Sequence, residues 1–183
     1  MSKRAVIVVD IQNEYFAAGK LPLVNIEQAA ANAARVIAMA RQDKDLLIHV
    51  RHEFPDPNAP LFTPGSDGVK IHESVAPETD ESVILKNYPN SFLKTNLKEL
   101  LDSNGIEDIV VIGAMSHMCI EATSRAASDF GYKVTVVADA CATMDLEFNG
   151  VKAPAAQVHT TAMAALEFAY GSITSTQAYL NAE

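Results

Sequence analysis

Three residues of the sequence are of types that together could hydrolyse a carbonyl compound. Cys119 offers a thiol nucleophile, Asp10 a carboxylate and Lys86 a cation. A nearby cation and a helix amino terminus both stabilise a thiolate, so they are expected to lower the pKa of the thiol. Partial burial would raise the pKa of Asp10, which could then take the thiol proton and return it to a leaving amine. The set predicts nucleophilic catalysis through an acyl-enzyme.

These residues lie at or just after the ends of predicted strands. Asp10 closes the first strand, Lys86 closes the third, and Cys119 follows the fourth near the start of a predicted helix. In an open parallel sheet, ligands bind outside the carboxyl ends of the strands, where the strand order reverses. With strand order 3-2-1-4-5-6, Asp10 and Cys119 would lie side by side. Backbone N–H groups around Met115 and Cys119 could then receive the oxyanion formed by attack on a carbonyl.

Short β-branched runs alternate with longer helical patterns along the chain, which is typical of βαβ units. Strands are expected at 5–10, 46–51, 83–86, 108–113, 133–139 and 172–176, and helices at 25–42, 91–101, 119–130, 155–170 and 177–181. Asn25 and Gln28 form a predicted capping pair. The strand runs are continuously apolar, as expected of strands covered on both faces. The pattern predicts an α/β fold with three layers: a doubly wound, mostly parallel sheet of about six strands between helices.

Residues 52–82 break this alternation, because they show no clear period and contain several prolines. The prolines are Pro55, Pro57, Pro60, Pro64 and Pro77. We expect a long ordered loop that forms either a wall of the substrate site or a subunit contact, with a variable surface excursion as the alternative.

Composition limits the classes of function. With 183 residues, of which 49% are hydrophobic and 20% charged, the chain is expected to form one domain over residues 1–183. A net charge of −9 has the wrong sign for a nucleic-acid binder. No apolar stretch approaches the roughly 18 residues of a membrane span, and the first residues resemble a strand more than a signal peptide. We expect a soluble cytoplasmic protein that binds neither nucleic acid nor membranes.

Three segments around the candidate residues resemble motifs of the isochorismatase-like cysteine hydrolases, a family related to nicotinamidase and N-carbamoylsarcosine amidohydrolase. They are VVDIQNEY (8–15), VILKNYPNSF (83–92) and VIGAMSHMCIEAT (111–123). The segments follow the family's order, and the resemblance covers nearly the whole chain. It implies a catalytic triad of Asp10, Lys86 and Cys119, and a cis peptide bond between Ala114 and Met115. It also implies a homo-oligomer, a dimer or a tetramer.

Five further residues are candidates for substrate contacts. They are Gln12, Phe16, Phe62, Phe92 and His117. Each has a structural alternative, because a polar side chain after a strand often caps the turn and aromatic rings more often pack in a core.

The resemblance does not extend to a metal site. Nicotinamidases of this family bind a metal through an Asp-x-His arrangement after the second strand, where this chain reads HVRHEFPDP. His49, His52 and His72 are present, but the spacing is not. We therefore expect neither a metal nor another cofactor.

Cys119 also bears on the reaction. Family members that hydrolyse isochorismate cleave a vinyl ether and do not depend on a cysteine nucleophile. A thiol nucleophile favours a cysteine hydrolase that cleaves a small amide, ureide or carbamoyl C–N bond through a thioester. The alternatives are a vinyl ether hydrolase, a non-enzymatic thiol sensor and a nucleotide or flavin binder, although no GxGxxG loop follows the first strand. Cys141 is expected to be buried in a loop after the fifth strand and is given no role.

Overall fold

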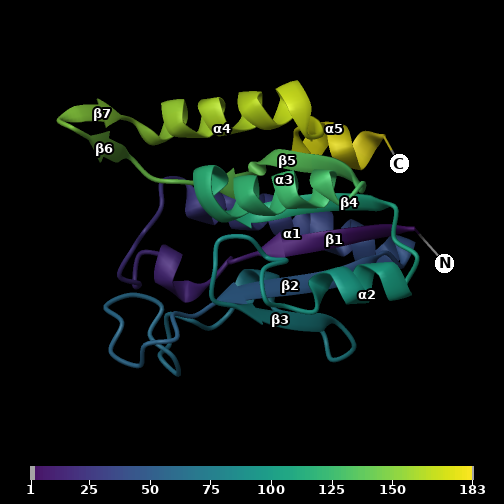
Figure 1. Ribbon diagram of the computed structural model, residues 1–183, viewed down its shortest axis with the longest axis horizontal. Coiled ribbons are helices and arrows are strands. Elements are labelled where there is room, and N and C mark those ends of the chain that lie inside the picture. Colours follow the sequence, from purple (N-terminus) through teal and green to yellow (C-terminus); the bar gives the residue numbers. More distant parts are fainter. Residues whose placement is uncertain (1–2, 183) are drawn as a thin grey trace.

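A parallel sheet of six strands forms the centre of the computed structural model, which describes residues 3–182 (Figure 1). The order is β3-β2-β1-β4-β5-β8, and every neighbouring pair is parallel. The strands are β1 (Arg4–Val9), β2 (Leu46–His52), β3 (Ser82–Lys86), β4 (Asp108–Ala114), β5 (Lys133–Ala142) and β8 (Ser172–Thr174). The predicted doubly wound sheet and its strand order are confirmed, with β8 as the sixth predicted strand.

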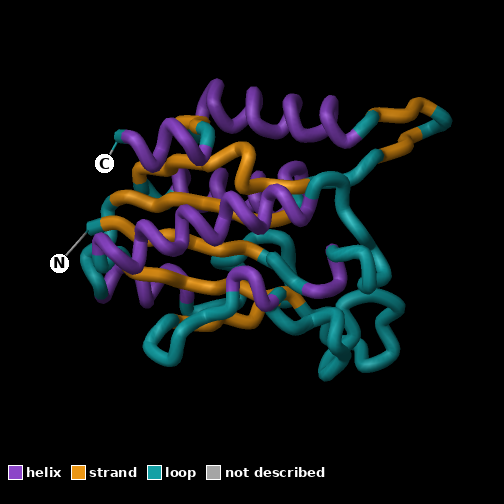
Figure 2. Tube along the Cα trace, turned by 180° about the vertical axis from the view of Figure 1, so that it is seen from behind, coloured by secondary structure: helices purple, strands orange, loops and turns teal. Residues whose placement is uncertain are grey.

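Helices cover both faces of the sheet (Figures 1 and 2). One face carries α1 (Ile26–Asp43) and α5 (Thr176–Asn181), and the other carries α2 (Leu97–Ser103), α3 (Glu121–Asp129) and α4 (Ala155–Ala169). Successive side chains of β1 alternate between the two cores, since Val8 packs on the α1 side and Val9 on the α3 side. Burial on both faces explains the continuous apolar runs of the sequence. None of the helices among residues 3–182 is long and apolar enough to span a membrane.

Two details of the predicted helices are wrong. The second helix begins at Leu97 and not at Ser91, because side chains in the preceding segment bind the backbone locally. The Asn90 side chain accepts the N–H of Phe92 at 2.9 Å, and the Thr95 hydroxyl donates to the carbonyl of Ser91 at 2.6 Å. Such bonds compete with helix formation. The predicted capping pair is also absent, since Asn25 has φ 59° and its side chain makes no cap hydrogen bond.

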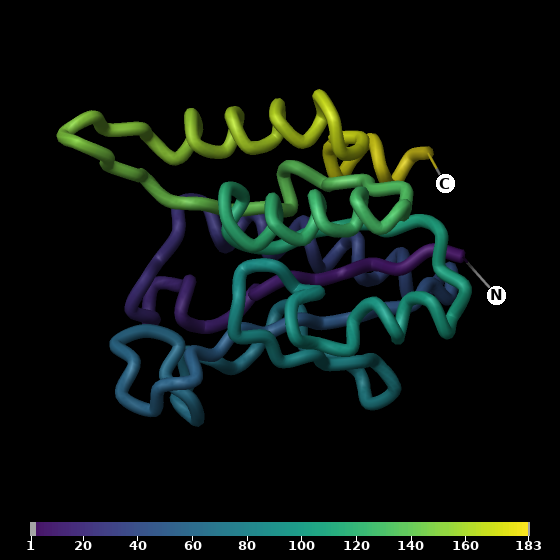
Figure 3. The backbone as a smooth tube through the Cα atoms, viewed as in Figure 1, coloured from purple at the N-terminus to yellow at the C-terminus, as the bar shows by residue number. Residues whose placement is uncertain are grey.

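The chain around the end of β5 also differs from the expectation. β5 continues to Ala142 through an irregularity in its pairing with β4, so Cys141 is buried within a strand and not in a loop. A hairpin of β6 (Leu146–Phe148) and β7 (Val151–Ala153) then projects beyond α4 (Figure 3). Its turn is Asn149–Gly150, both with positive φ. An Asn-Gly pair is a strong hairpin signal, which could have predicted this element.

The proline-rich segment packs against the residues that follow β1. The N–H of Asn13 donates to the carbonyl of Lys70 at 3.0 Å, and the N–H of Glu14 donates to that of Gly68 at 2.9 Å. The buried carboxylate of Glu14 accepts the N–H of Phe62 at 2.9 Å. These bonds fix the segment beside the carboxyl ends of β1 and β2, and its role as a wall of the site stays a prediction.

Candidate active site

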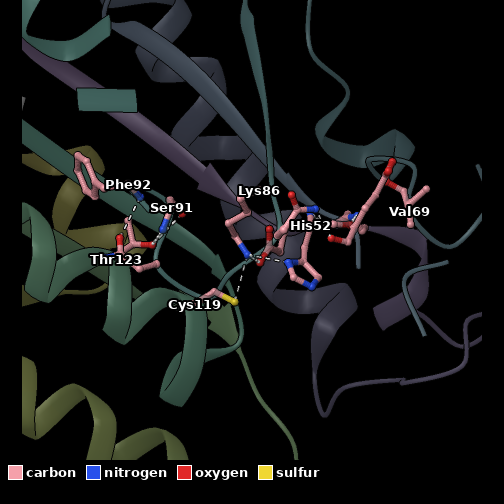
Figure 4. Close-up of polar contacts among 12 residues, drawn as sticks. His52, Val69, Lys86, Ser91, Phe92, Cys119 and Thr123 are labelled. Atoms are coloured by element: carbon pink, nitrogen blue, oxygen red, sulfur yellow. Dashed lines mark hydrogen bonds and ion pairs between the residues drawn. The ribbon is translucent and has the colours of Figure 1, made fainter. Parts of the chain in front are cut away.

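Asp10, Lys86 and Cys119 meet at the carboxyl end of the sheet. The Lys86 Nζ lies 2.6 Å from Asp10 Oδ2 and 3.4 Å from Cys119 Sγ (Figure 4). Asp10 is fully buried, Lys86 is 1% exposed and Cys119 is 7% exposed. One ammonium group therefore contacts a carboxylate and a thiol, with little water around any of the three.

Asp10 occupies a sharp turn directly after β1. Its backbone has φ 53°, in the left-handed region that Asp and Asn tolerate better than most residues. The turn is held by the N–H of Asp10, which donates to the carbonyl of Val50, and by the N–H of Gln12, which donates to the carbonyl of Asp10, both at 2.9 Å. These bonds fix the backbone that carries the carboxylate.

Cys119 lies in a π-helical turn, Ser116–Ile120, between β4 and α3. The N–H of Ile120 donates to the carbonyl of Met115 at 3.2 Å, five residues back. The peptide bond between Ala114 and Met115 is cis, which is the geometry implied by the resemblance. Single π-helical turns such as Ser116–Ile120 are frequent at functional sites. The nucleophile candidate is therefore inside a tight turn and not at the first residue of the following helix.

The electrostatics of the thiol differ from the expectation. Burial and the nearby charge of Asp10 raise the pKa of Cys119 to about 12, although Lys86 acts to lower it. The predicted low pKa was wrong because the loss of hydration outweighs the cation. Burial likewise raises the pKa of Asp10 against the opposing charge of Lys86.

Lys86 remains charged in this setting. Burial would lower its pKa, but the charges of Asp10 and Cys119 raise it above its ordinary value. One cation thus faces two acids, and the site is neutral when one of the two holds a proton. The raised pKa values of both acids agree with this count. The hydrogen bond between the two acids raises the pKa of Cys119 and lowers that of Asp10, which favours a resting state with the proton on Cys119.

Gly113 allows β4 to approach β1 closely beside the site. It is paired with Val9, it has φ +127°, and a Cβ atom there would lie 1.9 Å from the carbonyl oxygen of Val9. Since the obstacle is backbone, no side-chain movement could relieve the clash. Only glycine fits between the strand ends that carry Asp10 and the nucleophile turn.

Gly113→Ala is therefore expected to destabilise the protein by about 4 kcal/mol or more, among the largest effects of single substitutions. Chemical denaturation followed by circular dichroism measures this free energy of unfolding. Gly131→Ala is the matched control, because Gly131 also has a positive φ of +90° but has nothing within 4 Å of the added Cβ. A loss at Gly113 no larger than the loss at Gly131 would show that the close approach is not the cause.

Gln12 holds the end of β2 to the proline-rich segment. Its Oε1 accepts the N–H of His52 at 2.7 Å, and its Nε2 donates to the carbonyls of His52 at 2.9 Å and Val69 at 2.8 Å. The side chain is fully buried with both amide hydrogens used. Gln12 thus supports the backbone, in place of the substrate contact suggested by the sequence.

Two of the other candidates for substrate contacts line cavities that do not include the triad. Phe16 stacks on His72 with ring centroids 3.6 Å apart and lines a cavity of about 770 Å³. His117 binds the Thr143 hydroxyl at 2.7 Å and lines a cavity of about 350 Å³. Neither cavity has a triad residue in its walls.

The two remaining aromatic candidates differ in position. The Phe62 ring lies 5.3 Å from the ring of His52, which itself contacts Lys86, so Phe62 adjoins the triad. Phe92 instead packs on Phe130, at 5.2 Å between centroids, and on Tyr132, which places it in the core between α2 and α3.

Ser91 and Thr123 join the lysine and nucleophile motifs behind the triad. Their hydroxyl groups lie 2.8 Å apart, and the N–H of Ser91 donates to Thr123 Oγ1 at 3.2 Å (Figure 4). Both side chains are fully buried. This pair ties the segment after β3 to α3.

The three histidines considered as metal ligands do not converge. His49 binds Glu81 at 3.0 Å, His52 lies against Lys86, and His72 stacks on Phe16. Within residues 3–182, no group of three or more His, Cys, Asp or Glu side chains is arranged to hold a metal ion.

Sequence reasoning missed two residues beside the triad. His52 ends β2 in register with Lys86 and was considered only as a metal ligand. Tyr15 is buried, and its pKa is raised well above the ordinary value by burial and by the charges of Asp10 and Cys119. His52 closes its strand as Lys86 closes β3, so the position that identified Lys86 could also have identified His52.

Comparisons with known proteins found matches over almost the whole chain. The family model described as Isochorismatase domain matches residues 4–178. An uncharacterized isochorismatase family protein of Bacillus subtilis, YddQ, is 46% identical and covers 96% of this chain and 98% of its own length. The crystal structure of a putative isochorismatase hydrolase from Oleispira antarctica has a TM-score of 0.94 and 50% identity, with 97% of this chain and 96% of that chain covered.

More distant relatives carry names that state a reaction. Nicotinamidase 3 of Arabidopsis thaliana is 27% identical over 79% of this chain and 76% of its own length. Maleamate amidohydrolase of Pseudomonas putida is 28% identical over 74% of this chain and 70% of its own length.

Proposed function

The chain belongs to the isochorismatase family of hydrolases, and we propose on this basis that Cys119 cleaves the C–N bond of a small amide, ureide or carbamoyl compound. The observation that carries the proposal is the contact of the Lys86 ammonium with both Asp10 and Cys119. Two relatives named for amide hydrolysis support it. Phe62, which adjoins the triad through His52, is the proposed apolar wall of the substrate site.

In the proposed first step, Cys119 Sγ attacks the carbonyl carbon while Asp10 takes the thiol proton. Transfer of this proton keeps the site neutral, because Lys86 then pairs with the developing sulfur charge in place of the carboxylate charge. The raised pKa of Asp10 makes it a better proton acceptor. The backbone N–H groups of Met115 and Cys119 are the proposed oxyanion hole.

In the second step, Asp10 returns the proton to the nitrogen, the C–N bond breaks and a thioester remains on Cys119. Water then attacks the thioester carbonyl and gives a proton to Asp10. The carbon–sulfur bond breaks, the acid product leaves, and Asp10 reprotonates the thiolate. The sum is hydrolysis of one C–N bond by one water molecule, with Lys86 charged throughout.

Two alternatives are less well supported. Hydrolysis of a vinyl ether does not depend on a cysteine nucleophile, so it would give the buried thiol beside Lys86 no function. A thiol sensor needs an accessible cysteine with a low pKa, whereas Cys119 is buried and its pKa is raised to about 12.

A hydrolysis screen tests the proposal. Small amides, ureides and carbamoyl compounds are incubated with the protein, ammonia release is measured, and isochorismate is included as the vinyl ether. We expect turnover of at least one nitrogen compound and a larger kcat/KM for it than for isochorismate. Turnover of isochorismate alone, or oxidation of Cys119 by mild peroxide without turnover of any compound, would contradict the proposal.

A further inference from the structure

Lys86 must reach across a neighbouring strand to join the triad. It ends β3, whereas Asp10 follows β1, and β2 lies between these two strands. Adjacent strands are about 4.8 Å apart, so the Lys86 side chain crosses the end of β2. The residue at that end, in register with Lys86, is His52. The long side chain thus passes over His52 on its way to the carboxylate.

The Lys86 ammonium has three N–H donors, and three acceptors lie within reach. They are Asp10 Oδ2 at 2.6 Å, Cys119 Sγ at 3.4 Å and His52 Nδ1 at 3.5 Å. Figure 4 shows the last two contacts as dashed lines that meet at Lys86 Nζ. We propose that His52 is a positioning residue of this hydrolase, whose Nδ1 accepts the third N–H of Lys86 and keeps the ammonium beside Cys119. This inference rests on the proposed function.

The His52 ring is suited to accept and is held from several sides. Burial, together with the charge of Lys86, lowers its pKa to about 4, so the ring is neutral near pH 7. A neutral ring that accepts at Nδ1 carries its proton at Nε2. The rings of Phe54 and Phe62 pack edge-on against it, at 4.8 and 5.3 Å. The Gln12 side chain binds both the N–H and the carbonyl of His52.

The contact between Lys86 and His52 affects whether the ammonium group pairs mainly with Asp10 or with Cys119. Without an acceptor at His52, a buried donor of Lys86 would lack a partner, which is unfavourable. The ammonium is then expected to withdraw toward Asp10, the nearer of its two remaining partners, and to stabilise the Cys119 thiolate less. The thiolate is the species that attacks the substrate and also reacts with alkylating agents.

The test compares His52→Asn, which keeps an acceptor near the place of Nδ1, with His52→Leu, which keeps bulk without one. We expect His52→Leu to lower kcat by about tenfold to a hundredfold with little change in KM, and His52→Asn to retain most of the activity. Alkylation of Cys119 by iodoacetamide across pH gives a readout that needs no substrate. His52→Leu should react at least several-fold more slowly at each pH, and His52→Asn nearly as the wild type.

Phe54→Leu is the packing control, because it removes a ring that contacts His52 and leaves the Nδ1 acceptor. It should alkylate like the wild type. Equal alkylation of His52→Leu and the wild type, or equal impairment of His52→Asn and His52→Leu, would overturn the inference. If His52→Leu does not fold, nitrogen NMR of the wild type decides, since a proton on Nδ1 at neutral pH excludes the proposed contact. The alkylation and NMR measurements can contradict the role of His52 without contradicting the proposed amide hydrolysis, because neither needs a substrate.

Discussion

Replacing Cys119 with alanine is expected to reduce kcat/KM for the amide substrate by about 10⁴-fold or more, because no other described group takes the place of the nucleophile. Cys119→Ser should be almost as inactive. A hydroxyl is a much weaker acid than a thiol, and a site that already raises the pKa of a thiol to about 12 cannot ionise it. Steady-state kinetics of ammonia release measures both variants.

Cys141→Ala is the matched control for the loss of a buried thiol. Cys141 is also buried, its Sγ binds the carbonyl of Val137 at 3.4 Å, and burial raises its pKa to about 12 as well. It has no contact with Lys86 or Asp10, so its replacement should leave kcat/KM nearly unchanged. Retained activity in Cys119→Ala would remove the basis of the mechanism.

Replacing Asp10 with asparagine is expected to have opposite effects on turnover and on thiol reactivity. Turnover should fall by about 10²- to 10⁴-fold, because the group that carries the proton from the thiol to the leaving nitrogen is lost. Alkylation of Cys119 near neutral pH should become at least tenfold faster. The charge of Asp10 raises the pKa of the thiol, and without it Lys86 is free to pair with the thiolate.

Asparagine suits this test because it tolerates the left-handed backbone of residue 10, where φ is 53°. Turnover and the rate of iodoacetamide alkylation are measured on the same preparation. Misfolding would also expose the buried Cys119 thiol and speed its alkylation, so the variant must first show the circular dichroism spectrum and the unfolding transition of the wild type. Slower alkylation in Asp10→Asn would contradict the proposed sharing of one proton between the two acids.

The strands of the sheet could be predicted from the sequence, whereas the boundaries of some helices and strands could not. Short β-branched runs predicted all six strands. The runs of β1 and β4 are continuously apolar because both faces of these central strands are buried, whereas β3 and β8 at the sheet edges are partly exposed. The start of α2 was missed because the side chains of Asn90 and Thr95 bind the backbone in place of a helical turn. The extension of β5 to Ala142 depends on an irregular pairing with β4 that leaves no clear local signal.

The site was predictable in its members but not in its electrostatics. The positions of Asp10, Lys86 and Cys119 at or just after strand ends, together with the three motifs, predicted that these residues form one site. The predicted direction of the shift in the Cys119 pKa was wrong, because the degree of burial that raises it depends on how the folded chain packs. His52 was missed as a partner of Lys86, since its contact depends on the path of the lysine side chain across β2. The expected homo-oligomer and cytoplasmic location stay predictions.

The most direct test of the account is detection of the acyl-enzyme. The protein is mixed with an active amide, quenched in acid within the first turnovers, and digested for peptide mass spectrometry. The account predicts that the peptide containing Cys119 gains the mass of the acyl group, and that hydroxylamine at neutral pH removes it, as expected of a thioester. Turnover with no acyl group on Cys119 under conditions that trap the intermediate, or acylation of a different residue, would contradict the account.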